Sequence, residues 1–148
     1  MPDNDIARPL FSGVASSYEL ASQLLSYGQY RRWQRSLVEK LVLPEPALVL
    51  DMATGTGAVA FRVARRPQVR VVAADVTRAM LLQAQARAGG DGRQPAIDLV
   101  ECTAEAMPFP DASFDAVIFT YLLRYVADVP ATLRELTRVV RPGGMLLS

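Results

Sequence analysis

The residues with the clearest chemical potential lie at positions 51–57. A short apolar run, 48–50, ends in Asp51, and the chain then passes through Gly55 and Gly57 into a helix-forming segment. This order is typical of a buried parallel strand, a tight ligand-facing loop and a helix N-terminus. The spacing from Gly55 through Gly57 to Ala60 also fits the dinucleotide-binding fingerprint, so the loop alone does not identify its ligand.

Asp51 distinguishes between the ligands that such a loop can hold. A carboxylate just before the loop repels a pyrophosphate, but it suits a ligand that carries an ammonium or sulfonium charge. S-adenosylmethionine carries both of these charges. The alternative is that Asp51 only caps a turn, which the two glycines close.

A second carboxylate, Asp75, ends the next apolar run, 69–75. It falls about 20 residues after the glycines, and an acidic side chain at that position reaches ribose hydroxyls. Ligands of open α/β sheets lie across the carboxyl ends of the strands. We therefore expect Asp51 and Asp75 to face one crevice.

Two further apolar runs end in small polar residues. The run 97–102 leads into Thr103 and Ala104, and the run 116–120 ends in Thr120. By the same rule, both threonines are expected at the crevice.

The remaining segments alternate between strand and helix patterns, which predicts a doubly wound, mostly parallel α/β sheet. Helices are expected at 58–65, 77–88 and 130–140, a turn at 89–95 and the start of a fifth strand at 145–148. Apolar residues at helical spacing before the first strand predict N-terminal helices. We interpret the chain as a single domain, with a helical lid at 1–43 and a ligand-binding core at 44–148.

Composition narrows the class of protein. The chain has 148 residues, of which 51% are apolar, and a net charge of +1. One globular domain is expected, without nucleic acid as an electrostatically bound partner. No leader or bilayer-spanning run is evident, so a cytoplasmic protein without stable membrane insertion is predicted. The single cysteine, Cys102, lies in an apolar strand pattern; histidine is absent, and no metal site is expected.

Four blocks of sequence carry a resemblance to a known family. They are 11–18 with 26–33, then 51–57, then 104–111 with 113–115, and finally 133–136 with 138–144. In these blocks the chain resembles the class I S-adenosylmethionine-dependent methyltransferases, and it is most similar to the ubiquinone/menaquinone biosynthesis C-methyltransferases. The first block is the most specific to the quinone group.

The resemblance implies a Rossmann-like fold, S-adenosyl-L-methionine as cofactor and a small-molecule methyl acceptor, such as a quinol or phenolic precursor. It implies that Gly55, Thr56 and Gly57 bind the cofactor through their backbone and that Asp75 binds the ribose. It also implies that Thr103 and Ala104 lie beside the adenine, and Thr120 near the methionine end. No catalytic residue is assigned. Arg124 could favour a phenolate on the acceptor or could simply lie on a helix surface.

The sequence also departs from the family. Members normally have two further strands after the segment 145–148, so a C-terminally truncated fold is expected, with a homodimer or aggregate formed through the open sheet edge. Ala58 stands where the family often has an acidic residue. Residues 122–125 read Leu-Leu-Arg-Tyr in place of the quinone group's Gly-Leu-Arg-Asn.

Two other functions remain open. A domain of this kind could bind S-adenosylmethionine without catalysing transfer. A dinucleotide-dependent oxidoreductase could use the same strand, loop and helix, although Asp51 disfavours it.

Overall fold

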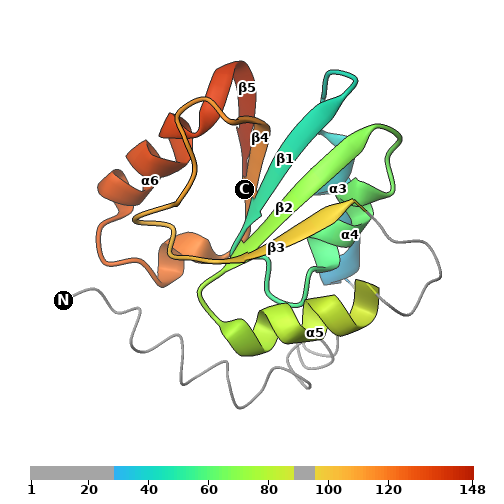
Figure 1. Cartoon of the computed structure of the whole chain (residues 1–148), viewed down its shortest axis with the longest axis horizontal. Coiled ribbons are helices and arrows are strands. Elements are labelled where there is room, and N and C mark those ends of the chain that lie inside the picture. The colour runs from blue at the N-terminus through green and yellow to red at the C-terminus, as the bar shows by residue number, and fades with distance from the viewer. Residues whose placement is uncertain (1–28, 89–95) are drawn as a thin grey trace.

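The computed structural model describes residues 29–88 and 96–148, which form a five-stranded parallel sheet between helices (Figure 1). The strand order is β3-β2-β1-β4-β5, so the chain starts in the middle of the sheet, runs to one edge and then crosses to the other. This is a doubly wound α/β fold, as predicted. The strands are β1 (Ala47–Met52), β2 (Val69–Asp75), β3 (Ile97–Glu101), β4 (Phe114–Phe119) and β5 (Val140–Leu147).

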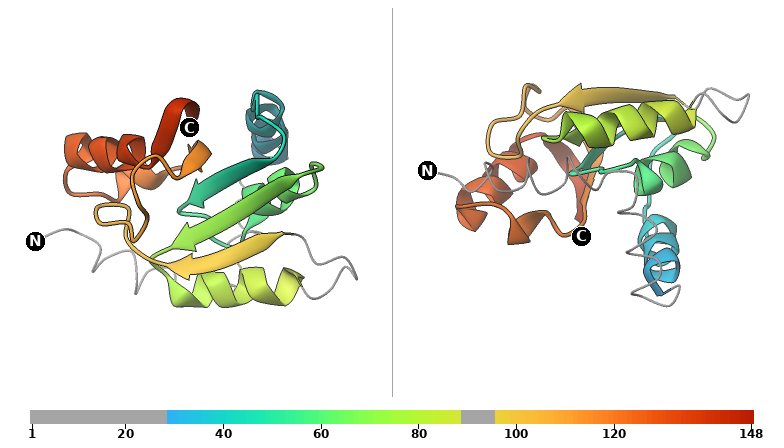
Figure 2. Two further views of the ribbon diagram at one scale, coloured as in Figure 1. Left: turned by 45° about the horizontal axis from the view of Figure 1, so that its top comes forward. Right: turned by 90° about the horizontal axis from the view of Figure 1, so that it is seen from below.

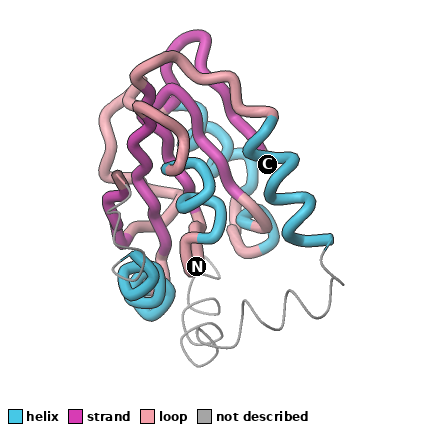
Figure 3. The backbone as a smooth tube through the Cα atoms, turned by 90° about the vertical axis from the view of Figure 1, so that its right-hand side faces the viewer, coloured by secondary structure: helices cyan, strands magenta, loops and turns pink. Residues whose placement is uncertain are grey.

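Helices cover both faces of the sheet (Figures 2 and 3). The first three described helices lie on one side and α6 lies on the other, while a short 3-10 helix follows β4. The helices are α3 (Gln29–Glu39), α4 (Ala58–Ala64), α5 (Arg78–Ala88), η1 (Leu122–Arg124) and α6 (Val129–Arg138). None of these described helices has the length and apolar character that crossing a membrane requires.

The central strands are buried on both faces, which explains their continuous apolar sequences. In β1, Val49 packs with α3 and α4, and the next residue, Leu50, packs on the α6 side. Both side chains are fully buried. The sheet therefore separates two apolar clusters, and each cluster fixes one layer of helices against the strands.

Local sequence signals set the start of α6. The Asp128 side chain accepts a hydrogen bond from the Ala131 N–H at 2.8 Å, which caps the helix, and Pro130 lies in its first turn. Pro is well tolerated there because the first N–H groups of a helix have no partner within it. The helix buries Thr132 and Leu136 against the sheet.

β5 begins earlier than the sequence pattern indicates. The pattern predicts a helix up to 140 and a strand from 145, but α6 ends at Arg138 and β5 starts at Val140. Pro142 and the two glycines after it are accommodated in an irregular stretch, in which the register jumps from Phe114–Val140 to Ala116–Met145. Within the described sheet, β5 is an edge strand that pairs with β4. Association through this edge stays a prediction.

Only part of the predicted N-terminal lid can be compared with the structure. Residues 1–28 and the predicted turn 89–95 lie outside the described residues. The rest of the lid contains α3, whose Leu37 packs into the same apolar cluster as Val59 of α4. α3 therefore packs beside α4 on the same face of the sheet.

We predict that α6 stabilises the fold chiefly through Leu136. This side chain is 0% exposed, whereas Leu82, a leucine of α5, is 54% exposed. Leu136→Ala is expected to lower the free energy of unfolding by about 2–5 kcal/mol, because it leaves a cavity. The matched variant Leu82→Ala should change it by less than about 0.5 kcal/mol. Urea denaturation of both variants measures the difference; equal losses would contradict this role for α6.

Candidate functional site

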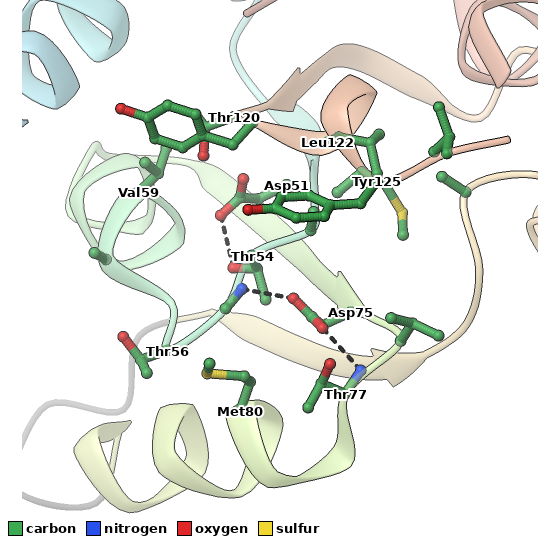
Figure 4. Close-up of a pocket in the computed structure, with 18 of the residues that line it drawn as sticks. Asp51, Thr54, Thr56, Val59, Asp75, Thr77, Met80, Thr120, Leu122 and Tyr125 are labelled. Carbon is green, nitrogen blue, oxygen red and sulfur yellow. Dashed lines mark hydrogen bonds between the residues drawn. The ribbon is translucent and has the colours of Figure 1, made fainter. Parts of the chain in front are cut away.

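A pocket opens at the carboxyl ends of β1, β2 and β4, where a doubly wound sheet places its ligand (Figure 4). Thr56, Thr77 and Met80 lie on one side of it, and Leu122 and Tyr125 lie on the other. The full lining is Tyr30, Gln34, Asp51, Met52, Ala53, Thr54, Gly55, Thr56, Ala58, Val59, Asp75, Val76, Thr77, Met80, Ala104, Glu105, Thr120, Tyr121, Leu122, Tyr125 and Val126.

Asp75 ties together three segments at the base of the pocket. One of its carboxylate oxygens accepts a hydrogen bond from the Gly55 N–H at 2.8 Å, and the other accepts from the Thr77 N–H at 2.8 Å (Figure 4). The side chain is buried, and this burial raises the pKa of Asp75 although the two N–H groups oppose the shift. Asp75 thus links the end of β2 to the β1–α4 loop and to the start of α5.

Asp51 holds the other side of the same loop. It is the penultimate residue of β1, and its carboxylate accepts hydrogen bonds from the Thr54 hydroxyl at 2.7 Å and the Ala60 N–H at 3.1 Å. Burial raises the pKa of Asp51 to about 7; the two hydrogen bonds oppose this shift, and the nearby Asp75 adds to it. Asp51 therefore changes its charge near neutral pH.

The two loop glycines have different surroundings. Both have positive φ, +58° at Gly55 and +82° at Gly57. A Cβ on Gly55 would have no atom within 4 Å, and Gly55 lines the pocket. A Cβ on Gly57 would lie 2.7 Å from the Phe61 ring and 3.3 Å from Ala84. Gly55 leaves space at the pocket, whereas Gly57 allows α4 and α5 to pack closely.

The structure brings six of the eight predicted site residues to the pocket: Asp51, Gly55, Thr56, Asp75, Ala104 and Thr120. Gly57 and Thr103 do not line it. Thr103 lies just after β3 and forms an isolated bridge with Ala106. That bridge shapes the loop from which Ala104 reaches the pocket.

The sequence predicted helices before the first strand, but it did not identify the residues of α3 and of the turn after β4 that line the pocket. Tyr30 and Gln34, one helical turn apart on α3, line the pocket together with Tyr121 and Tyr125. Tyr121 has a φ of +58°, and its ring stacks on that of Tyr30 with centroids 6.2 Å apart. Trp33 completes the aromatic cluster, with its ring centroid 5.9 Å from that of Tyr121. The i, i+4 spacing of Tyr30 and Gln34 was the available signal, but it does not say which surface the helix faces.

Arg138, at the end of α6, anchors the loop that contains Ala104. Its guanidinium donates to the Phe109 carbonyl at 2.8 Å and to the Asp111 carboxylate at 2.7 Å. It also pairs with Glu135 at 2.6 Å, and Glu135 in turn accepts from the Met107 N–H at 3.0 Å. These contacts join the sequence blocks 104–111 and 133–144.

The charged side chains of the pocket restrict the charge of the ligand that it can bind. Three carboxyl residues, Asp51, Asp75 and Glu105, line it, and no lysine or arginine does so among the described residues. Such a lining favours a ligand with positive charge and hydroxyl donors over a phosphate-rich one. The described ranges also contain no group of three His, Cys, Asp or Glu side chains that could hold a metal ion.

Comparison with known proteins identifies a family of methyltransferases. The model of the ubiE/COQ5 methyltransferase family matches residues 3–148. The ubiquinone/menaquinone biosynthesis C-methyltransferase UbiE of Desulfotalea psychrophila is 41% identical over 91% of this chain, and the match covers 54% of that protein. The demethylmenaquinone methyltransferase of Thermus thermophilus is 40% identical over 93% of this chain and is covered over 62% of its length. The chain thus spans somewhat more than half the length of these relatives.

Solved structures show the same fold. YcgJ from Bacillus subtilis has a TM-score of 0.72 and 28% identity, over 79% of this chain and 50% of its own. The [4+2]-cyclase SpnF has a TM-score of 0.73 and 30% identity, over 78% of this chain and 43% of its own. An S-adenosylmethionine-dependent methyltransferase from Aquifex aeolicus, at 22% identity, shares the fold with a TM-score of 0.64, over 74% of this chain and 58% of its own.

The two glycines provide a matched pair for mutation, since an alanine at either position would be strained by the positive φ. Gly57→Ala is expected to destabilise the fold more than Gly55→Ala, because only its Cβ meets Phe61 and Ala84. Gly55→Ala should instead weaken the binding of S-adenosylhomocysteine, because its Cβ enters the pocket. Thermal denaturation and calorimetry of both variants separate the two effects; the reverse ranking in stability would contradict the assignment.

The raised pKa of Asp51 predicts a pH dependence of stability. In the unfolded chain the Asp51 carboxyl group has a pKa of 3.8, whereas burial in the folded protein raises its pKa to about 7. The stabilisation present below pH 3.8 is therefore lost as the pH rises towards 7, by up to about 4 kcal/mol. Asp51→Asn should remove this loss, so the free energies of unfolding of the two proteins should diverge across that window. Parallel pH profiles in urea denaturation would show that Asp51 titrates normally.

Proposed function

The chain belongs to the ubiE/COQ5 methyltransferase family, and from this premise we propose that it binds S-adenosylmethionine and transfers its methyl group to a small quinol or phenol. The observation that carries the proposal is Asp75, at the end of β2 and at the base of an acid-lined pocket. The names of the relatives, which are quinone-biosynthesis methyltransferases, support a quinol as the acceptor.

We assign the ribose of the cofactor to Asp75. Each of its oxygens accepts one backbone N–H, from Gly55 and from Thr77. A carboxylate has about four lone-pair positions, so acceptor sites remain for the two hydroxyls of a ribose. The backbone bonds also hold the carboxylate in place before the ligand arrives, which lowers the cost of binding.

The other proposed contacts follow the order of the strands. Ala104 at the β3 side is assigned to the adenine, with Thr103 holding the loop beside it, and Thr120 at the end of β4 is assigned to the methionine portion. The β1–α4 loop lies between them, so Thr56 and the loop backbone contact the middle of the ligand. Asp51 supplies negative charge near the ammonium or sulfonium group. We also propose that 1–43 acts as a lid over the core 44–148.

The bound cofactor supplies a methyl group that is already activated by its sulfonium sulfur. The protein must therefore orient the acceptor and keep water out, and proximity of this kind accounts for much of the rate in such reactions. The aromatic cluster of Tyr30, Trp33 and Tyr121 contributes two of its rings, those of Tyr30 and Tyr121, to the lining of the pocket. A planar quinol ring can stack on the faces of these rings. Arg124 lies 5.5 Å from the Tyr121 ring centroid, but it is exposed and does not line the pocket, so an effect of its charge on the acceptor phenol stays a proposal.

A methyl-transfer assay tests the proposal. The chain is incubated with S-adenosylmethionine and reduced benzoquinol, naphthoquinol and simple phenol acceptors, and the products are analysed by mass spectrometry. We expect one added methyl group on a quinol and release of S-adenosylhomocysteine. Binding of S-adenosylhomocysteine with no transfer to any acceptor would instead identify a cofactor-binding domain without catalytic activity.

We predict that Asp75→Ala weakens S-adenosylhomocysteine binding by about 1.5–3 kcal/mol, because hydrogen bonds to a charged group are lost. Asp98→Ala is the control, since Asp98 is exposed on β3 and pairs with Arg70 at 3.1 Å, away from the pocket. Calorimetry on folded variants gives both affinities. Unchanged binding in Asp75→Ala would remove Asp75 from the site.

A further inference from the structure

Gln34 is a buried polar residue of the pocket whose amide nitrogen is unpaired within the described part of the chain. Its side chain belongs to α3, is 2% exposed and lines the pocket. Its amide nitrogen, Nε2, has no hydrogen-bond partner in the structure as described. A buried donor without an acceptor is costly, and most buried polar groups are paired. The pairing partner of Nε2 is therefore expected to come from a ligand.

The position of α3 places Gln34 at one end of the pocket. Tyr30, one turn earlier on the helix, stacks on Tyr121 directly after β4. Asp75 lies at the end of β2, and β1 separates β2 from β4 in the sheet. Gln34 is thus associated with the end of the pocket opposite the ribose site. On the proposed function, this is the end that receives the methionine portion of the cofactor.

The methionine portion has one strong acceptor, its carboxylate, and no cationic side chain among the described lining residues meets it. The described lining contains three carboxyl residues and neither lysine nor arginine. Among the described lining residues a ligand carboxylate can therefore meet only neutral donors, and Gln34 provides the only side-chain amide of that set. Its terminal torsion is broad and roughly two-fold, so a modest rotation can turn Nε2 towards the ligand.

We propose that Gln34 is a positioning residue whose Nε2 donates a hydrogen bond to the carboxylate of the bound cofactor. This inference rests on the proposed function, since it takes S-adenosylmethionine as the ligand. The bond would anchor the amino-acid end from α3 while Asp75 anchors the ribose from β2. Two anchors at opposite ends fix where the sulfur lies between them.

Three ligands and one substitution test the proposal. Gln34→Met keeps the length of the side chain but removes the donor. It should weaken the binding of S-adenosylhomocysteine by about 10- to 100-fold, the value expected for a hydrogen bond to a charged group. Affinity for decarboxylated S-adenosylhomocysteine and for methylthioadenosine, which lack the carboxylate, should stay unchanged. Calorimetry on the full chain provides all the affinities.

A matched control lies on the same helix. Gln29 is exposed at the start of α3, so Gln29→Met should bind all three ligands as the wild-type chain does. Gln34→Glu is a second variant, in which the added negative charge should selectively weaken S-adenosylhomocysteine binding. This variant retains a polar side chain of the same length if the Met variant folds poorly.

The possible results distinguish a failure of the Gln34 inference from a failure of the proposed function. Equal weakening of all three ligands by Gln34→Met would show a packing role and overturn the inference. Unchanged binding of S-adenosylhomocysteine would overturn it as well. If the wild-type chain binds methylthioadenosine and S-adenosylhomocysteine, the proposed cofactor stands whatever the variants do. If it binds neither, the proposed function fails together with the inference.

Discussion

The site depends above all on the hydrogen bonds that Asp75 accepts from two backbone N–H groups. They join the end of β2 to the β1–α4 loop through Gly55 and to the start of α5 through Thr77. Because the carboxylate is buried, each bond acts in a medium where electrostatic interactions are strong. The loop conformation, with positive φ at Gly55, is held from the neighbouring strand. The geometry of the pocket is thus set before any ligand binds.

A second set of contacts holds the loop after β3 against α6, on the other face of the sheet. Arg138, at the end of α6, binds two carbonyls and the Asp111 carboxylate in the loop after β3. Asp115 provides a similar link at the start of β4. Partial burial opposes its ionisation, but the Leu48 N–H and Arg141 together lower the pKa of Asp115. Charged side chains therefore reinforce the loop after β3 and the start of β4 in addition to the apolar core.

The sequence predicted those parts of the site that follow from strand order. Asp51 and Asp75 end apolar runs, and parallel strands bring such ends together on one edge. It did not predict Gln34 or Tyr121, because their place depends on how α3 packs against a turn almost ninety residues further along the chain. Nor did it predict the role of Gly57, since a close contact between two helices leaves no local pattern. Spacing along one chain segment predicts local geometry, whereas contacts between distant segments need the folded structure.

The acidic lining bears on how the proposed methyl donor and its product would each be bound. A sulfonium ligand brings positive charge to a pocket whose buried acids, Asp51 among them, are costly to ionise in the empty state. The ligand and the carboxylates therefore stabilise each other's charges, and this attraction is strong where water is excluded. On the proposed function, methyl transfer would remove the charge from the sulfur, so the product would lose part of that attraction. The same carboxylates would then attract the product less strongly than the methyl donor.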